Sequence, residues 1–146
     1  GLRRADVGNR AGQTHLAAGP IGDPQQQRGE RPEATDVEDA EQGETLLLTP
    51  YGHQTSPTAY ASKGPIFIRE RHAPRAEWHD NIPDQLKARL ISLRAYDADG
   101  MMLDADVVDG NALEPLIERF LADDKTDYLH AHFARRGCYA ALIERA

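Results

Sequence analysis

The chain has 146 residues and a formal net charge of −7, from 17 Lys and Arg against 24 Asp and Glu. This length suits one domain with some additional chain. The single cysteine, Cys138, excludes an intramolecular disulfide framework and a zinc site built from several cysteines. Net acidity argues against nonspecific nucleic-acid binding, and no apolar run is long enough to span a membrane. We therefore expect a soluble, cytoplasmic protein without nucleic-acid or membrane partners.

Residues 1–35 differ in composition from the rest of the chain. They hold five Arg and four acidic residues, a net charge of +1, with six Gly, three Pro and no aromatic residue. The remaining 111 residues have a net charge of −8 and contain all nine aromatic side chains. A segment with so little apolar surface cannot offset the entropy cost of ordering its backbone. We expect residues 1–35 to be a flexible or aberrant tail, and residues 36–146 to form a single domain.

Apolar patterning predicts strands and a short helix in the first part of that domain. Residues 45–49 form an apolar run stopped by Pro50, and residues 66–69 form a second run opened by a Gly-Pro pair. A short helix is expected over residues 82–88. The alternation of apolar side chains then predicts strands over 90–96 and 101–108, joined by the turn Asp-Ala-Asp-Gly. These two strands form an antiparallel hairpin with one face toward solvent.

The second part of the domain contains the clearest helix, over residues 111–122. Its apolar residues recur at helical spacing, and Asn111 with Glu114 resembles a capping box. Residues 128–133 and 138–143 predict a second hairpin across an Arg-Arg-Gly turn. The expected fold is α+β, with a mostly antiparallel sheet of about six strands on which the helices 111–122 and 82–88 pack.

Several short segments resemble a family of bacterial proteins known only as a domain of unknown function, DUF1203. The most informative are Arg-Ala-Tyr-Asp-Ala-Asp-Gly-Met-Met at 94–102, Asp-Val-Val-Asp-Gly at 106–110 and Arg-Gly-Cys-Tyr at 136–139. Further matches are Glu-Asp-Ala at 38–40, Gly-Glu at 43–44, Gly-Pro-Ile-Phe at 64–67 and Leu-Glu at 113–114. The resemblance covers residues 36–146 and implies no activity. Family members carry a cysteine just before the Glu-Asp-Ala segment, and this chain has none there.

His130 and His132 are the most distinctive candidate site residues. Side chains at i and i+2 of a strand lie on one face, so two imidazoles would stand about 7 Å apart. Imidazole nitrogen is a good ligand for a transition metal, and His53, Cys138 or an Asp are candidates for a third ligand. The alternative interpretation is that both histidines line the polar face of a half-exposed hairpin.

Cys138 and Arg94 also admit two interpretations each. Cys138 is either a small buried hydrophobic residue or a thiolate activated by neighbouring arginines or a histidine. Arg94 either binds an anionic substrate or pairs with Asp104 or Asp106 of the neighbouring strand. The aspartates around the 97–100 turn lack the acid spacing of a helix–loop–helix calcium site.

The sequence thus predicts a small domain that is a binding or accessory module, without a recognisable enzyme motif. The residues expected to line a pocket are His53, Arg94, His130, His132 and Cys138. Two alternatives remain open: a metal-binding protein or metal-dependent enzyme that uses His130 and His132, and a homo-oligomerisation module whose sheet face is covered by a second copy.

Overall fold

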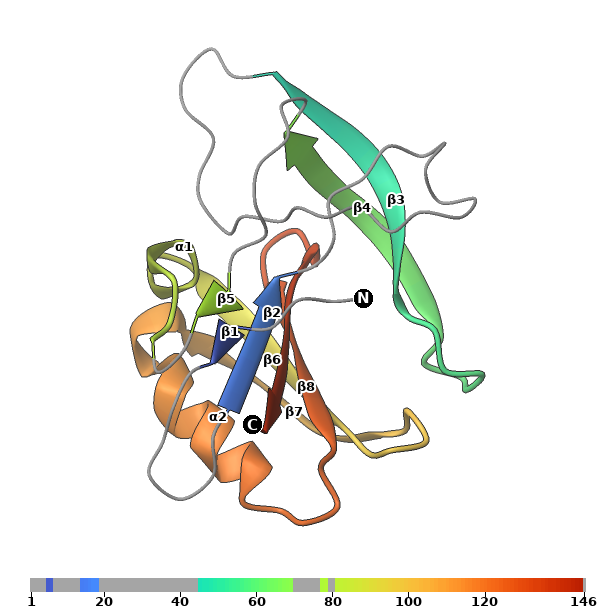
Figure 1. Cartoon of the computed structure of the whole chain (residues 1–146), viewed down its shortest axis with the longest axis vertical. Helices are drawn as coiled ribbons and strands as arrows, with labels where there is room; N and C mark the ends of the chain where they lie inside the picture. Colours follow the sequence, from blue (N-terminus) through green and yellow to red (C-terminus); the bar gives the residue numbers. More distant parts are fainter. Residues whose placement is uncertain (1–4, 7–13, 19–44, 70–76, 79–80, 146) are drawn as a thin grey trace.

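The structure is a computed structural model that describes residues 5–6, 14–18, 45–69, 77–78 and 81–145 (Figure 1). Its larger sheet has the strand order β1-β2-β9-β8-β6-β7, and β5 pairs with β2. Every strand pair in it is antiparallel. The bounds of these strands are β1 Ala5–Asp6, β2 Thr14–Ala18, β5 Glu77–Trp78, β6 Leu90–Tyr96, β7 Met102–Asp109, β8 Tyr128–Phe133 and β9 Tyr139–Arg145.

The remaining two strands form a separate antiparallel hairpin, and three short helical segments complete the described fold. The hairpin consists of β3 (Leu46–Gln54) and β4 (Ser62–Arg69). The helical segments are α1 (Asp84–Lys87), the 3-10 helix η2 (Gly110–Ala112) and α2 (Leu113–Leu121). The predicted α+β class is therefore confirmed, and all six predicted strands are present. Two of them, β3 and β4, lie outside the larger sheet.

Two short strands of the N-terminal segment are described, β1 and β2. Strand β2 pairs with β9, through Thr14 opposite Arg145 and Ala18 opposite Ala141, and so extends the larger sheet. The short strand β1 pairs in turn with β2. Backbone pairing does not require an apolar period, and sequence periodicity therefore gives no signal for these strands. The other residues of the expected tail lie outside the described part of the chain.

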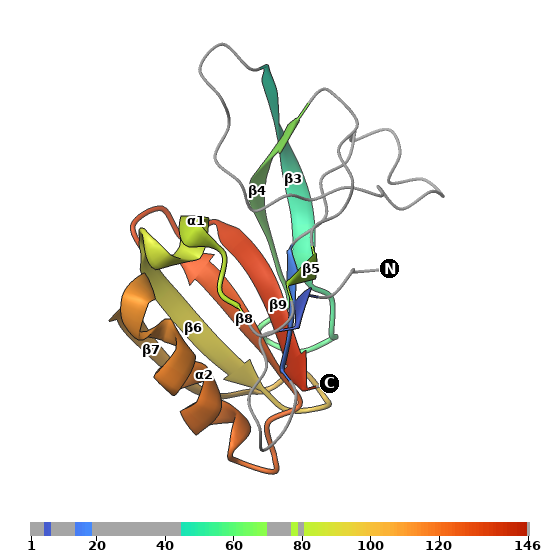
Figure 2. The same ribbon diagram turned by 60° about the vertical axis from the view of Figure 1, so that its left-hand side comes forward.

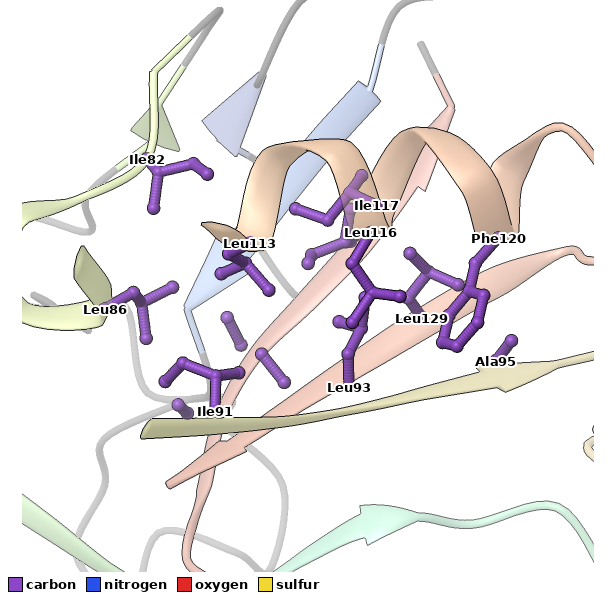
Figure 3. Close-up of a cluster of buried hydrophobic side chains, with 14 residues drawn as sticks. Ile82, Leu86, Ile91, Leu93, Ala95, Leu113, Leu116, Ile117, Phe120 and Leu129 are labelled. Carbon is purple, nitrogen blue, oxygen red and sulfur yellow. The ribbon is translucent and has the colours of Figure 1, made fainter. Parts of the chain in front are cut away.

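One face of the larger sheet packs against α2 and forms the apolar core (Figure 3). From the helix, Leu113, Leu116, Ile117 and Phe120 are buried, which confirms the predicted apolar stripe. From the sheet, the alternate residues of the central strands meet them, namely Ile91, Leu93, Ala95, Leu129, Ala131, Ala141 and Ile143. Burial of this apolar surface is the main favourable contribution to folding.

The predicted cap of this helix is wrong in its details. The helical region starts with η2, and Asp109 is its N-cap, with a side-chain oxygen that accepts a hydrogen bond from the Asn111 backbone N–H. Asn111 therefore lies inside the 3-10 turn, and Ala112, which precedes α2, makes no side-chain cap. Pro115 falls in the first turn of α2, where its missing N–H removes no helical hydrogen bond.

The β3–β4 hairpin lies on the other side of the larger sheet from α2 (Figure 2). Its ladder runs from Leu46 opposite Arg69 to Gln54 opposite Ser62. The ladder is irregular between Gly52 and Gln54, so that His53 has no residue directly opposite it. Such a bulge re-aims the side chain of the extra residue. His53 is in consequence directed onto the sheet.

Candidate functional site

Strand alternation places polar and aromatic side chains on the sheet face opposite the apolar core. In β6 this face carries Ser92, Arg94 and Tyr96, because Ile91, Leu93 and Ala95 belong to the core. In β8 and β9 it carries Tyr128, His130, His132 and Tyr139. The register sets Arg94 directly opposite His130, and His132 opposite both Ser92 and Tyr139. The prediction that His130 and His132 share a face is confirmed, with ring centroids 6.2 Å apart.

The β3–β4 hairpin adds a third imidazole to these two. The ring of His53 stacks on Tyr139 with centroids 5.2 Å apart and an interplanar angle of 10°. It meets His132 edge-on at 4.9 Å and His130 at 6.0 Å. Three histidines from two separate sheets thus form one cluster, although 77 positions separate His53 from His130 in the sequence.

Two polar contacts hold the end of the hairpin against the larger sheet. The side-chain amide of Gln54 lies 2.8 Å (Nε2) and 3.1 Å (Oε1) from the Tyr128 hydroxyl. The Thr58 hydroxyl donates to the carbonyl oxygen of Gly100 at 3.2 Å. Gly100 has φ +84°, and a Cβ there would lie 2.3 Å from Cβ of Ser56. The turn between β6 and β7 therefore requires glycine, both for its backbone conformation and for the approach of the hairpin loop.

All five tyrosines of the chain join the three histidines in a single set of ring contacts. His130 lies 5.0 to 5.2 Å from the rings of three tyrosines. We call this set the histidine–tyrosine face; its members are His53, His130, His132, Tyr51, Tyr60, Tyr96, Tyr128 and Tyr139. The tyrosines were not among the predicted site residues. The strand alternation that places His130 and His132 on one face also places Tyr128 there. In the same way, Tyr96 lies two residues from Arg94 and shares its face.

Burial keeps the three imidazoles uncharged near neutral pH. His130 is 3% exposed and His132 is 1% exposed. Burial, with the neighbouring charges of His132, His53 and Arg94, lowers the pKa of His130 to about 3. Burial is also the main cause that lowers the pKa of His132 to about 4, and it lowers the pKa of His53 as well. Arg94 contributes to the lowering of the pKa at all three.

The hydrogen bond of His132 fixes where its proton lies. Nδ1 is 3.0 Å from the carbonyl oxygen of Gly137, which can only accept, so Nδ1 carries the hydrogen. Because the ring is neutral, Nε2 then presents a lone pair. Among the residues that the structure describes, this Nε2 is buried without a hydrogen-bond partner, as is Nδ1 of His130 and Nδ1 of His53. Buried polar atoms without partners are rare in folded proteins, and here three of them lie in one cluster.

Arg94 lies on the same face, and its alternative pairing with neighbouring aspartates is wrong. Asp104 and Asp106 are opposite Ala95 and Leu93 in the register, and they therefore lie on the α2 side of the sheet. Asp106 pairs there with Arg119 at 3.1 Å. The half-buried Arg94 instead makes a side-chain hydrogen bond with Tyr96. Within the described residues, no carboxylate forms an ion pair with Arg94.

Cys138 lies next to the cluster and is not one of its ring contacts. It immediately precedes β9 and is a half-buried free thiol. The contact with His132 comes from the backbone of the preceding residue, Gly137. Of the five predicted pocket residues, the structure brings four together and leaves Cys138 at the margin.

The described acidic and ligating side chains bear on the calcium and metal interpretations. Oδ1 of Asp97 accepts hydrogen bonds from the backbone N–H groups of Asp99 and Met101, so this carboxylate closes the turn. In the described parts of the chain, no three His, Cys, Asp or Glu side chains are arranged to hold a metal ion.

Among the helices that the structure describes, none is long and apolar enough to cross a membrane.

These observations define a class: a small α+β domain whose antiparallel sheet has one apolar face under a helix and one histidine–tyrosine face under a β-hairpin. The family model described as "Protein of unknown function (DUF1203)" matches residues 32–145. The chain belongs to this family, as the short motifs of the sequence predict. Neither the curated proteins nor the solved structures yielded a significant match.

Proposed function

We propose that this domain is a binding module that holds a small molecule on the histidine–tyrosine face. The observation that carries the proposal is the set of three buried imidazole nitrogens, on His53, His130 and His132, that have no hydrogen-bond partner in the described part of the chain. A buried polar atom that lacks a partner costs about 1–3 kcal/mol. A bound molecule that supplies those partners recovers this free energy.

The construction of the site supports the same function. Gln54 and Thr58 hold the hairpin in place by contacts to Tyr128 and Gly100 that do not involve the histidines. The imidazole positions are therefore set by the surrounding structure, and His132 is oriented further by the Gly137 carbonyl. A site whose polar groups are fixed before binding loses little conformational entropy when its ligand arrives.

Ligand-dependent unfolding tests this function. The full chain is melted alone and with each member of a panel of small polar compounds and of Zn²⁺, Ni²⁺ and Mn²⁺. A molecule present at 100 times its dissociation constant stabilises the native state by about 2.7 kcal/mol. We expect at least one compound to raise the midpoint of the wild type and of Arg119→Gln, a control on the opposite face, and to lose its effect in His132→Leu. A complete panel without any shift that depends on His132 would refute the proposal.

A transition-metal ion is the second candidate ligand, favoured by one observation. In metal sites the nitrogen of histidine that does not bind the metal usually donates to a carbonyl or carboxylate, as Nδ1 of His132 does to Gly137. Two observations disfavour a metal ion. The positive charge of Arg94 lies nearby, and no three of the described His, Cys, Asp or Glu side chains are arranged to hold a metal. A midpoint raised by one metal in the wild type, and not in His130→Ala/His132→Ala, would favour the metal over an organic molecule.

The cellular setting is also a proposal. The chain's only cysteine is a free thiol, which is compatible with a reducing compartment. The sequence motifs resemble those of bacterial proteins. We therefore assign the domain to a bacterial cytoplasm; fractionation of cells that express the tagged native gene tests this, and recovery in the periplasm would contradict it.

A further inference from the structure

We propose that the ligand of the histidine–tyrosine face is a small organic carboxylate that carries a hydroxyl group, with its carboxylate on Arg94 and its hydroxyl donating to an imidazole. This inference rests on the proposed binding function and specifies its ligand. It follows from three features of the described residues: the charge of Arg94, the lone pair of His132, and the apolar strip beside them.

Arg94 supplies a fixed positive charge next to the imidazoles, and among the described residues no carboxylate forms an ion pair with it. Glu144, on the same face, lies opposite Tyr128 rather than opposite His130. Arg94 lies on the central strand β6, directly opposite His130, and is half-buried. The aspartates nearest to it on β7 point to the other side of the sheet. A guanidinium matches a carboxylate with two parallel hydrogen bonds, and such bonds are stronger than neutral ones. The complement of Arg94 is therefore an anion, and a cation beside it meets an unfavourable charge.

The imidazoles specify a second group on the ligand. Nε2 of His132 carries a lone pair, because Nδ1 donates its hydrogen to Gly137. A carboxylate has no hydrogen to give, so the carboxylate alone leaves this buried atom unpaired. A hydroxyl donor satisfies it. A ligand with both groups thus pairs with Arg94 and His132 together, whereas a simple carboxylate pairs with only one of them.

The remaining surface beside Arg94 is apolar and exposed. Ala105 lies opposite Arg94 on β7, and Val107 lies opposite Ser92, so both are on the same face. Val107 is 52% exposed. Leu90, which follows the same alternation on β6, is 43% exposed. An apolar body attached to the carboxylate removes this surface from water, and we therefore expect an aryl or alkyl hydroxy acid to bind better than glycolate.

Three probes that differ by one group each test the assignment. Mandelate has the carboxylate, the hydroxyl and an apolar ring; phenylacetate lacks the hydroxyl; mandelamide lacks the charge. Each is titrated into the full chain at neutral pH, with heat of binding and the histidine ring resonances as readouts. Inorganic phosphate is a fourth probe, because it too is an anion with hydroxyl groups.

We expect mandelate to bind most tightly. Phenylacetate should bind about threefold to tenfold more weakly, as expected for the loss of one neutral hydrogen bond. Mandelamide should bind at least about tenfold more weakly, because a charge-assisted pair is lost.

Arg94→Gln should weaken mandelate binding at least about tenfold and leave mandelamide binding unchanged, while Arg94→Lys retains part of the affinity for mandelate. His132→Leu should abolish the preference for mandelate over phenylacetate. Arg119→Gln, on the opposite face, is the matched control and should behave as wild type.

The outcomes separate this inference from the binding function itself. If mandelamide, or a metal ion, shifts the His130 and His132 resonances more strongly than mandelate does, the binding function stands and the anion assignment is wrong. Tighter binding of phosphate than of mandelate, dependent on Arg94, overturns the carboxylate in favour of a phosphate group. If none of the four probes shifts these resonances, the hydroxy-acid assignment is refuted. Circular dichroism of each variant must match wild type before its affinity is compared.

Discussion

The two faces of the larger sheet come from the same strands and have opposite chemistry. On one face Leu93, Leu129 and Ile143 pack against α2 and are fully buried. On the other, their immediate neighbours Arg94, His130 and Leu142 face the side that carries the β3–β4 hairpin. The buried side chains that pack together on the apolar face are all hydrophobic. The histidine–tyrosine face buries imidazoles, three of whose nitrogens find no hydrogen-bond partner among the described residues.

This contrast separates the part of the molecule that provides stability from the part available for binding. An apolar face gains free energy in proportion to the surface it buries. A buried polar face gains much less, because each desolvated nitrogen offsets part of the packing contribution. Natural proteins retain such groups most often at functional sites, where strain and unsatisfied groups are part of the function. Matched substitutions on the two faces should therefore have different effects on stability.

The largest effect is expected on the apolar face. Leu129→Ala removes a fully buried side chain that lies between the strands and α2. We expect the free energy of unfolding to fall by about 2–5 kcal/mol, because both the transfer of apolar surface and a new cavity contribute. Urea unfolding followed by circular dichroism measures it. A loss below about 1 kcal/mol would mean that Leu129 does not belong to the main core.

The second effect is a pH dependence that belongs to the histidine–tyrosine face. His130 and His132 have pKa values of about 3 and about 4 in the folded protein, against 6.5 when unfolded. Between these limits the unfolded chain binds more protons, so stability is fully present above pH 6.5 and is lost as the pH falls toward 4. Each histidine contributes a slope of about 1.4 kcal/mol per pH unit within this window.

Urea midpoints measured from pH 7.5 to 4.5 test this dependence. We expect His130→Leu to show a shallower slope than wild type, because one titrating group is gone. Arg119→Gln, on the other face, should retain the full slope. Equal slopes in wild type and His130→Leu would show that His130 does not titrate as its burial implies.

A third effect has the opposite sign to the first. Replacing His130 by Leu removes a buried nitrogen that has no partner and adds apolar surface to a site that is 3% exposed. We expect the free energy of unfolding at pH 7 to rise by up to about 1 kcal/mol. The same variant should bind ligands of the site less well. A loss of more than 1 kcal/mol would indicate that His130 has a structural role, and the distinction between the two faces would then fail.

Strand alternation made much of this arrangement predictable from the sequence. It assigned Ile91, Leu93 and Ala95 to one face of β6, and His130 and His132 to one face of β8. It could not predict that β3 and β4 would leave the larger sheet and lie across it, because that depends on long-range contacts such as Gln54 with Tyr128. No local sequence pattern therefore predicts the contact of His53 with His132. His53 is a candidate site residue only because imidazole can bind a metal or act as a base.

Two errors have local physical causes. The sequence pattern predicts Asn111 as the cap of the 111–122 helix, but Asp109 two residues earlier supplies an equally good acceptor and starts a 3-10 turn. The sequence also allows the aspartates of β7 to pair with Arg94. A strand register that is shifted by one residue reverses the face of every side chain, and only the observed pairing of Leu93 with Asp106 places them on the α2 side.

The smallest expected effect concerns β7, which is the edge of the larger sheet beyond β6. Homo-oligomerisation was one expectation from the sequence, and an exposed edge strand is a ready template for pairing with a second copy. Here the backbone N–H groups of Ala105 and Val107 donate at 2.8 Å to the carboxylates of Asp104 and Asp106. These aspartates compete with a second strand for the same donors and add negative charge to the edge.

We expect the wild type to remain a monomer of 16.2 kDa by light scattering. Asp104→Ala/Asp106→Ala should increase the mass with concentration, whereas Asp109→Ala, whose carboxylate caps η2, should not. A wild-type dimer would show that the aspartates do not protect this edge, and a double variant that stays monomeric would show that some other feature does.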